Sequence, residues 1–201
     1  MLTDDYLRFF RFIEKENLLL PTIGNEAVGN GTFAFSDELP AQGLLTTRDV
    51  WGFMDSQETT GISPTMFEEY IFPYYKQVAE QFGLLSYGCC EAVHPIWEKC
   101  LSKLENLRKL SISSWCDENY MGEQLASKKI IYHRKPSPNF LGVNTHLDIP
   151  ALKEHIDATL RAAKGCTVEF TQRDVYTVHH DMDKVRKYVC VIRECCEENW
   201  K

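Results

Sequence analysis

The sequence predicts an α/β protein in which about five parallel strands are covered by outer helices. From Val50 onward, short apolar runs alternate with segments of helical periodicity, which is typical of right-handed βαβ units. The runs are apolar at nearly every position rather than at every second one, as expected of strands that are buried on both faces. Both observations favour a parallel sheet between layers of helices.

Five strands are expected, at residues 50–56, 84–88, 109–114, 128–135 and 166–172. The five units occupy about 150 residues, close to the ~30 residues per unit of a complete eight-unit (β/α) barrel of ~250 residues. A chain of 201 residues is therefore too short for eight units, and an open or partial barrel is the expected architecture.

Helices are predicted at residues 63–83, 94–107, 116–127, 149–165 and 182–200. The first of them has the strongest signals, because Ser63 is a suitable N-cap, Pro64 suits the first helical position and Gly83 is a suitable stop. Pro73 inside this segment predicts a kink or a break, because proline lacks the backbone N–H and its ring clashes with the preceding turn.

The first 49 residues differ from the rest, which divides the chain into residues 1–49 and 50–201. Residues 1–17 are amphipathic and charged throughout, which predicts a helix and not a signal peptide. The segment that follows is rich in Gly, Asn and Pro and holds one weak strand or none. Long structureless segments in compact domains are usually functional or disordered. An ordered loop with a function, or a linker, is therefore expected.

Charge and composition narrow the classes of function. The net charge is -7 and no basic stripe is visible, which argues against nucleic-acid binding, since phosphate binding needs clustered Lys and Arg. No apolar run reaches the roughly 18 residues of a membrane span. Eight cysteines without a secretion signal favour free thiols in a reducing cytoplasm. The expected protein is cytoplasmic, binds no membrane or nucleic acid, and acts on a small molecule.

Reactive side chains are concentrated in the segment LLSYGCCEAVHPIW at residues 84–97. Thiolates and imidazoles are zinc ligands, so Cys89, Cys90 and His94 are the candidate metal ligands, and Glu91 is a candidate catalytic group. Adjacent cysteines seldom both reach one ion. Each residue also has a plainer interpretation: the cysteines pack as small apolar groups, Glu91 caps the next helix, and His94 begins that helix.

Two further strand ends supply charged candidates. Glu169 lies in a strand expected to be apolar on both faces, and a buried carboxylate must be paired, protonated or metal-bound. His133, Arg134 and Lys135 leave a strand just before two prolines. A cationic cluster at the carboxyl end of a barrel strand suits an anionic substrate or a corrinoid or phosphate tail. The alternative is a solvated loop paired with local acids.

The remaining candidates follow other strands. Lys135 and Glu169, with His179 after the last strand, join Glu91 as catalytic candidates. The candidate substrate-binding residues are aromatic or cationic side chains near strand ends: Tyr87, Trp115, Arg134, Arg173 and Tyr176. We expect Cys89, Glu91 and Glu169 to converge in one pocket with Lys135 and His179 on its rim, because barrel strand ends face a common mouth.

Several separated segments carry a family resemblance. They are FMDSQETTGISPTMFEEYIFPYYKQVAEQFG at 53–83, the YGCCE turn at 87–91, LRKLSISSWCD at 107–117 and YHRKPSPNFL at 132–141, with DELP at 37–40. In this order they resemble the C-terminal part of the uroporphyrinogen decarboxylase superfamily, and most of all a bacterial decarboxylase-like branch. The resemblance covers nearly the whole chain. It implies that residues 50–201 are the C-terminal part of a TIM-type (β/α)₈ barrel that lacks the first strands.

The superfamily also contains zinc- and corrinoid-linked methyltransferases, and the resemblance implies their cofactors. Their zinc is held by a His-x-Cys pair after one strand and by a Cys after the last. Cys89 stands at the cysteine of the pair, but Tyr87 replaces the histidine, and the segment from Cys166 has no cysteine at its carboxyl end. A rearranged zinc site is the alternative, from Cys89 or Cys90 with Glu91, His94 and Glu169. The implied corrinoid methyl carrier is bound to a partner protein.

Three classes of function remain. An enzyme of the methyltransferase type is favoured, because thiols stand at the strand end where the methyltransferases place theirs. A cofactor-free decarboxylase is the runner-up, because a polycarboxylated substrate needs bidentate cations and only Arg8, Arg11 and Arg48 precede Trp51. The third class is a non-catalytic half-barrel. Because five strands leave two open sheet edges, a homodimer or a separate N-terminal half is the expected partner.

Overall fold

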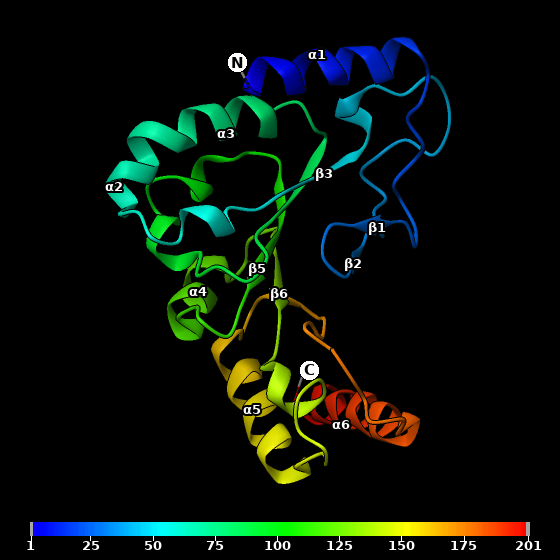
Figure 1. The fold of residues 1–201 in the computed structure, drawn as a ribbon, viewed down its shortest axis with the longest axis vertical. Helices are drawn as coiled ribbons and strands as arrows, with labels where there is room; N and C mark the ends of the chain where they lie inside the picture. The colour runs from blue at the N-terminus through cyan, green and yellow to red at the C-terminus, as the bar shows by residue number, and fades with distance from the viewer. Residues whose placement is uncertain (1, 200–201) are drawn as a thin grey trace. The chain divides into compact units, whose positions relative to one another are not determined.

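The computed structural model describes residues 2–199 and divides into two compact units, Met1–Leu110 and Ser111–Lys201. One sheet has the strand order β3-β4-β5-β6-β7. Its parallel strands are β3 Trp51–Met54, β4 Leu84–Tyr87, β5 Leu107–Ile112, β6 Ile131–Arg134 and β7 Thr167–Phe170. Figure 1 labels β3, β5 and β6 of this sheet. The predicted α/β class and the five parallel strands are confirmed, and the strands neighbour one another in the order of the sequence.

The helices are α1 Leu2–Lys15, α2 Pro64–Met66, α3 Phe72–Ala79, α4 Glu118–Leu125, α5 Ile149–Ala162 and α6 Met182–Asn199. Side-chain caps fix three of the starts, because the side chains of Ser63, Asp117 and Asp148 each accept a hydrogen bond from a backbone N–H in the first turn. None of the described helices is both long enough and apolar enough to cross a membrane.

The predicted break at Pro73 is confirmed. The chain passes from α2 into a π-helical turn, Phe67–Ile71, and α3 starts at Phe72 with Pro73 in its first turn. Proline has no N–H to continue the preceding helical ladder, but it is tolerated in a first turn, where that N–H has no helical partner.

The predicted helix at 94–107 is wrong. The structure has two short 3₁₀ turns there, His94–Ile96 and Leu101–Lys103. Cys100 lies between them with φ -125° and ψ -74°, which is outside the helical region. The segment is nevertheless well packed, since Trp97, Cys100 and Leu101 are almost fully buried. The apolar spacing therefore indicated burial correctly but not the backbone conformation.

The Gly- and Asn-rich segment holds more strand than expected. β1 Ala27–Val28 and β2 Thr32–Phe33 form a short antiparallel hairpin, and Gly29 and Gly31 adopt positive φ in its turn. Val28 and Ala34 pack with Trp51 and Leu84 in one apolar cluster, which holds the hairpin against β3 and β4.

The second unit has its own core between α5 and α6, which lie side by side. Its buried members are Leu141, Leu152, Ile156, Leu160, Tyr188, Val191 and Cys195. Gly122 of α4 packs directly on α5, because a Cβ at that position would lie 1.8 Å from the carbonyl oxygen of Ala162.

Candidate functional site

The YGCCE turn follows β4 and is tied to the end of β3. The backbone N–H of Gly88 donates to the carbonyl of Met54 at 2.8 Å, so the parallel pairing of the two strands continues into the turn. Gly88 has φ +95°, a conformation that glycine adopts without a side-chain penalty. The chain therefore turns sharply at Gly88, immediately before the two cysteines.

Glu91 is buried at this turn, with 5% of its surface exposed. One carboxylate oxygen accepts the backbone N–H of Ser56 at 2.9 Å, and the other accepts the backbone N–H of Cys89 at 2.9 Å. The carboxylate thus joins the segment after β3 to the turn after β4, and charge-assisted bonds of this kind offset the cost of burial. In this geometry Glu91 positions Cys89.

The two thiols lie side by side. Sγ of Cys89 is 3.8 Å from Sγ of Cys90, far longer than the ~2.05 Å of a disulfide bond, so no disulfide joins them. Cys89 is almost fully buried, whereas Cys90 is half-buried. The side-chain amide of Asn30 lies 2.8 Å from Sγ of Cys89 and donates to it. This bond fixes the position of the Cys89 sulfur against the hairpin tip.

The sequence arguments missed Asn30. It lies at the tip of the β1–β2 hairpin, far from Cys89 in sequence. The available signal was the Gly-Asn-Gly triplet at 29–31, which is typical of a tight hairpin turn. That signal predicts a turn, but it does not predict which strand end the turn contacts.

Lys109 was also missed. It lies in β5 with 2% of its surface exposed, and its ammonium donates to the hydroxyl of Thr32 at 2.6 Å and to the carbonyl of Phe33. The ammonium also lies 5.4 Å from the ring centroid of Trp51, within the range of a cation–π contact. Lys109 therefore fastens β2 to the sheet, and with it the hairpin that carries Asn30.

Tyr87 and His94 flank the turn. Tyr87 is almost fully buried, and its hydroxyl has no hydrogen-bond partner among the described residues. Burial raises the pKa of Tyr87, and the neighbouring carboxylate of Glu91 raises it further, so the phenol stays neutral. His94 is half-buried and begins a 3₁₀ turn.

The predicted zinc fits this turn only in part. Two thiolates on one tetrahedral zinc lie ~3.8 Å apart, since each Zn–S bond is about 2.3 Å, and this agrees with the observed 3.8 Å separation of the Cys89 and Cys90 sulfurs. Among the described residues, however, no three His, Cys, Asp or Glu side chains are grouped so that they could hold a metal ion. The described residues do not complete the site, and we assign no reaction step to zinc.

In the second unit, Arg134 is buried and fully bonded. Its guanidinium forms an ion pair with Glu118 at 2.5 Å. It also donates to the carbonyls of Ile112 and Ser113 and to the hydroxyl of Thr159, and it lies 3.3 Å from Nε2 of His155. These contacts occupy all five N–H donors of an arginine. The predicted substrate-binding residue is thus a clamp between β6, α4 and α5.

The other charged candidates of this unit lie on β6 and β7. His133 is buried, with Nε2 2.8 Å from the hydroxyl of Thr171, and it pairs in register with Glu169. Lys135 is also buried, with 3% of its surface exposed, rather than standing on an open rim. The expected burial of Glu169 is wrong: the residue is half-buried, because β7 is the edge strand of the sheet.

The candidates after β5 and β7 are mostly exposed. Trp115 is 76% exposed and Tyr176 is 84% exposed, so neither is enclosed as a pocket wall. His179 is exposed at φ +54° in an irregular segment, and Arg173 pairs weakly with Asp174 at 3.5 Å. Since Cys89 and Glu91 belong to the first unit and the other catalytic candidates to the second, their convergence stays a prediction.

Comparisons with known proteins identify no relative. Neither a scan against models of protein families nor searches of curated proteins and of solved structures find a match. The resemblance to the uroporphyrinogen decarboxylase superfamily therefore stays a prediction from the motifs. The function has to be argued from the geometry of the YGCCE turn and its neighbours.

Proposed function

We propose that this chain is a uroporphyrinogen decarboxylase-like enzyme of the methyltransferase type, and that the thiol pair of the YGCCE turn is its reactive group. The observation that carries the proposal is the pair itself, with the sulfurs of Cys89 and Cys90 3.8 Å apart directly after a parallel strand. In parallel α/β proteins, ligands bind at the carboxyl ends of the strands, which is where these thiols lie.

The surroundings of the thiols hold Cys89 in a defined position. Asn30 donates to Sγ of Cys89, and Glu91 holds the backbone N–H of the same residue. In the proposed step, a thiolate of the pair attacks the methyl carbon of an activated donor. The new S–C bond forms as the bond between the methyl group and the donor breaks, and the electron pair of that bond leaves with the donor.

The runner-up decarboxylase receives less support. A decarboxylase without cofactor needs cationic donors for the carboxylates of its substrate. Arg134, the most deeply buried arginine, has already used its donors on Glu118, His155, Thr159 and two backbone carbonyls. A methyltransferase of the proposed type needs the thiol pair and no such cationic donors. It is therefore the preferred interpretation.

The test is transfer of a labelled methyl group. The purified chain is incubated with deuterium-labelled methylcobalamin, which stands in for the predicted corrinoid carrier on a partner protein, and peptides are analysed by mass spectrometry. Label is expected on Cys89 or Cys90 and is expected to be lost in the C89A/C90A double variant. Cys190→Ala is the matched control, because Cys190 is exposed on α6. Label spread evenly over the exposed cysteines would contradict the proposal. Metal analysis of the same preparations checks the zinc prediction.

The proposal includes a partner, a partial barrel and a cytoplasmic location. β3 and β7 are the edges of the sheet, and uncovered edges favour association. One backbone group of the β3 edge has a partner, since the hydroxyl of Thr22 accepts the N–H of Trp51 at 2.8 Å. We expect a homodimer or a complex with a separate N-terminal half, and light scattering at micromolar concentration checks this. A clean monomer would contradict the homodimer, and the labelling experiment would remain decisive for the chemistry.

A further inference from the structure

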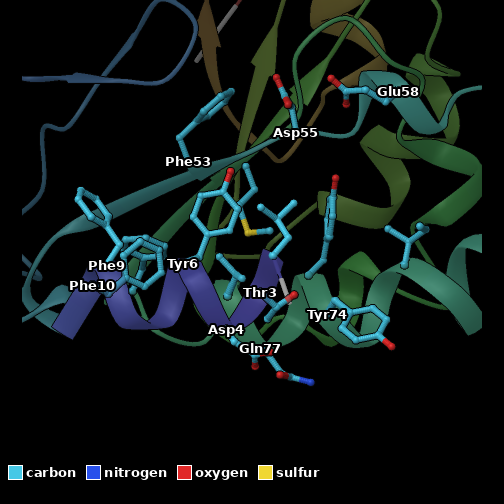
Figure 2. Close-up of a pocket in the computed structure, with 16 residues that line it drawn as sticks. Thr3, Asp4, Tyr6, Phe9, Phe10, Phe53, Asp55, Glu58, Tyr74 and Gln77 are labelled. Carbon is cyan, nitrogen blue, oxygen red and sulfur yellow. The ribbon is translucent and has the colours of Figure 1, made fainter. Parts of the chain in front are cut away.

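The first unit contains a large cavity with many aromatic side chains in its walls. Its volume is about 1080 Å³, just above the ~300–1,000 Å³ range of small-molecule pockets. Figure 2 shows that its walls come from α1, from α3 and from the end of β3 with the segment that follows. Seven aromatic side chains line it: Tyr6, Phe9, Phe10, Phe53, Tyr74, Tyr75 and Phe82. Neither Cys89 nor Cys90 is part of the lining.

All the charged residues in the lining are acidic. They are Asp4, Asp55 and Glu58, and no described Lys, Arg or His contributes to the walls. Neither Asp55 nor Glu58 forms an ion pair with a described residue. Two carboxylates without an ion-pair partner among the described residues therefore line a cavity whose other walls are largely aromatic and aliphatic.

The aromatic rings and the carboxylates lie near one another. The ring of Tyr6 points from α1 toward Phe53 and Asp55, and Glu58 lies beyond Asp55 on the same side of the cavity (Figure 2). Burial raises the pKa of Tyr75, and the charges of Glu58 and Asp55 raise it further, which places both carboxylates in the field of this wall residue. One ligand can thus contact rings and carboxylates together.

We propose that this cavity binds an organic cation, a protonated or quaternary amine with an apolar body. Aromatic faces attract an ammonium group through their negative quadrupole and accept an apolar body at the same time. Asp55 and Glu58 attract the positive charge and disfavour an anion of the same shape. The inference rests on the cavity alone and is therefore independent of the methyl-transfer proposal.

A pair of dyes tests the proposal on the full-length chain. Thioflavin T, an aromatic cation, is expected to bind with saturable fluorescence, and benzyltrimethylammonium is expected to displace it. The anionic dye anilinonaphthalene sulfonate is expected to bind at least tenfold more weakly, because the carboxylates repel it. Added salt should weaken thioflavin T binding, since exposed charges are screened.

Variants assign the binding to the named residues. The double variant D55N/E58Q should bind thioflavin T roughly tenfold more weakly, because it loses two partly solvated charge contacts, and it should lose most of the salt dependence. Tyr6→Leu should weaken binding by roughly two- to fivefold through the loss of one ring. Glu69→Gln is the matched control, because Glu69 is an exposed acid outside the lining, and it should change nothing.

Three outcomes overturn the proposal. The first is an absence of saturable thioflavin T binding by the wild-type chain. The second is equal binding of both dyes with no effect of D55N/E58Q, which would make the cavity a general apolar site. The third is a wild-type dimer that binds no dye, together with a Tyr6→Leu variant that is monomeric and does bind it. That result would make the cavity walls a subunit interface.

Discussion

Glu91 in the first unit and Arg134 in the second are both buried charges beside the end of a parallel strand. Glu91 accepts two backbone N–H groups and holds the turn that carries two thiols outside any disulfide bond. Arg134 uses every donor it has on protein partners. The difference shows that a buried charge at a strand end indicates a functional site only where a reactive side chain, such as a thiol, lies beside it. By this criterion the thiol turn is the candidate site, and the arginine cluster is structural.

The largest expected effect comes from removing Arg134. Arg134→Met leaves the carboxylate of Glu118 without its cation and several acceptors without a donor. Loss of one partner from a buried ion pair costs ~3–5 kcal/mol, and about 3 kcal/mol is expected because Glu118 keeps some solvent access. Urea denaturation followed by circular dichroism measures the change.

The control for this variant is Arg186→Met. Arg186 also pairs with an acid, Asp183, but both side chains are more than 70% exposed. A surface pair of this kind contributes ~0–1 kcal/mol, so the stability should hardly change. If the two variants lost the same stability, Arg134 would not be the clamp that its contacts indicate.

Glu91→Gln should have a smaller effect on stability but a specific effect on the thiols. Glutamine keeps one acceptor oxygen and turns an NH₂ group toward one of the two backbone donors, which costs ~1–3 kcal/mol. Because the N–H of Cys89 loses its anchor, Cys89 should react faster with iodoacetamide, as followed by mass spectrometry. Glu98→Gln, an exposed acid of the next segment, should leave the rate unchanged. An unchanged alkylation rate in Glu91→Gln would show that the Glu91 carboxylate does not control the reactivity of Cys89.

Much of the fold was predictable because its signals are local. The apolar runs predicted the strands, Ser63 and Pro64 predicted the start of the first long helix, and Pro73 predicted the break. The helix predicted at 94–107 was wrong because buried 3₁₀ turns place apolar residues at nearly the same spacing as an α-helix. Local spacing reports which residues are buried better than it reports the hydrogen-bond pattern.

The candidate site was predictable only in part, because its contacts are long-range. The thiol pair and Glu91 are visible as a motif, but the bonds from Asn30 and Ser56 come from segments that sequence spacing does not connect. The partners of Arg134 show the same limit: its charge predicted substrate binding or a solvated loop, whereas Arg134 is buried and pairs with Glu118 and several acceptors. A buried cation is recognised only when its partners are known.

The smallest expected effect concerns pH and His155, which lies against the arginine cluster. Burial lowers the pKa of His155, and the charge of Arg134 lowers it further, while Glu118 acts in the opposite direction. The ring also contacts Phe140, with centroids 5.1 Å apart. The folded protein therefore favours the neutral ring, so its stabilising contribution is complete above the ordinary histidine pKa of about 6.5. It is lost as the pH falls through the lower pKa of the folded state.

Urea midpoints measured between pH 7.5 and pH 5 should fall less steeply in His155→Gln, whose amide oxygen can still accept from Arg134. His146→Gln, at an exposed position, should follow the wild-type profile, and an unchanged slope in His155→Gln would show that acid destabilisation of this unit arises elsewhere.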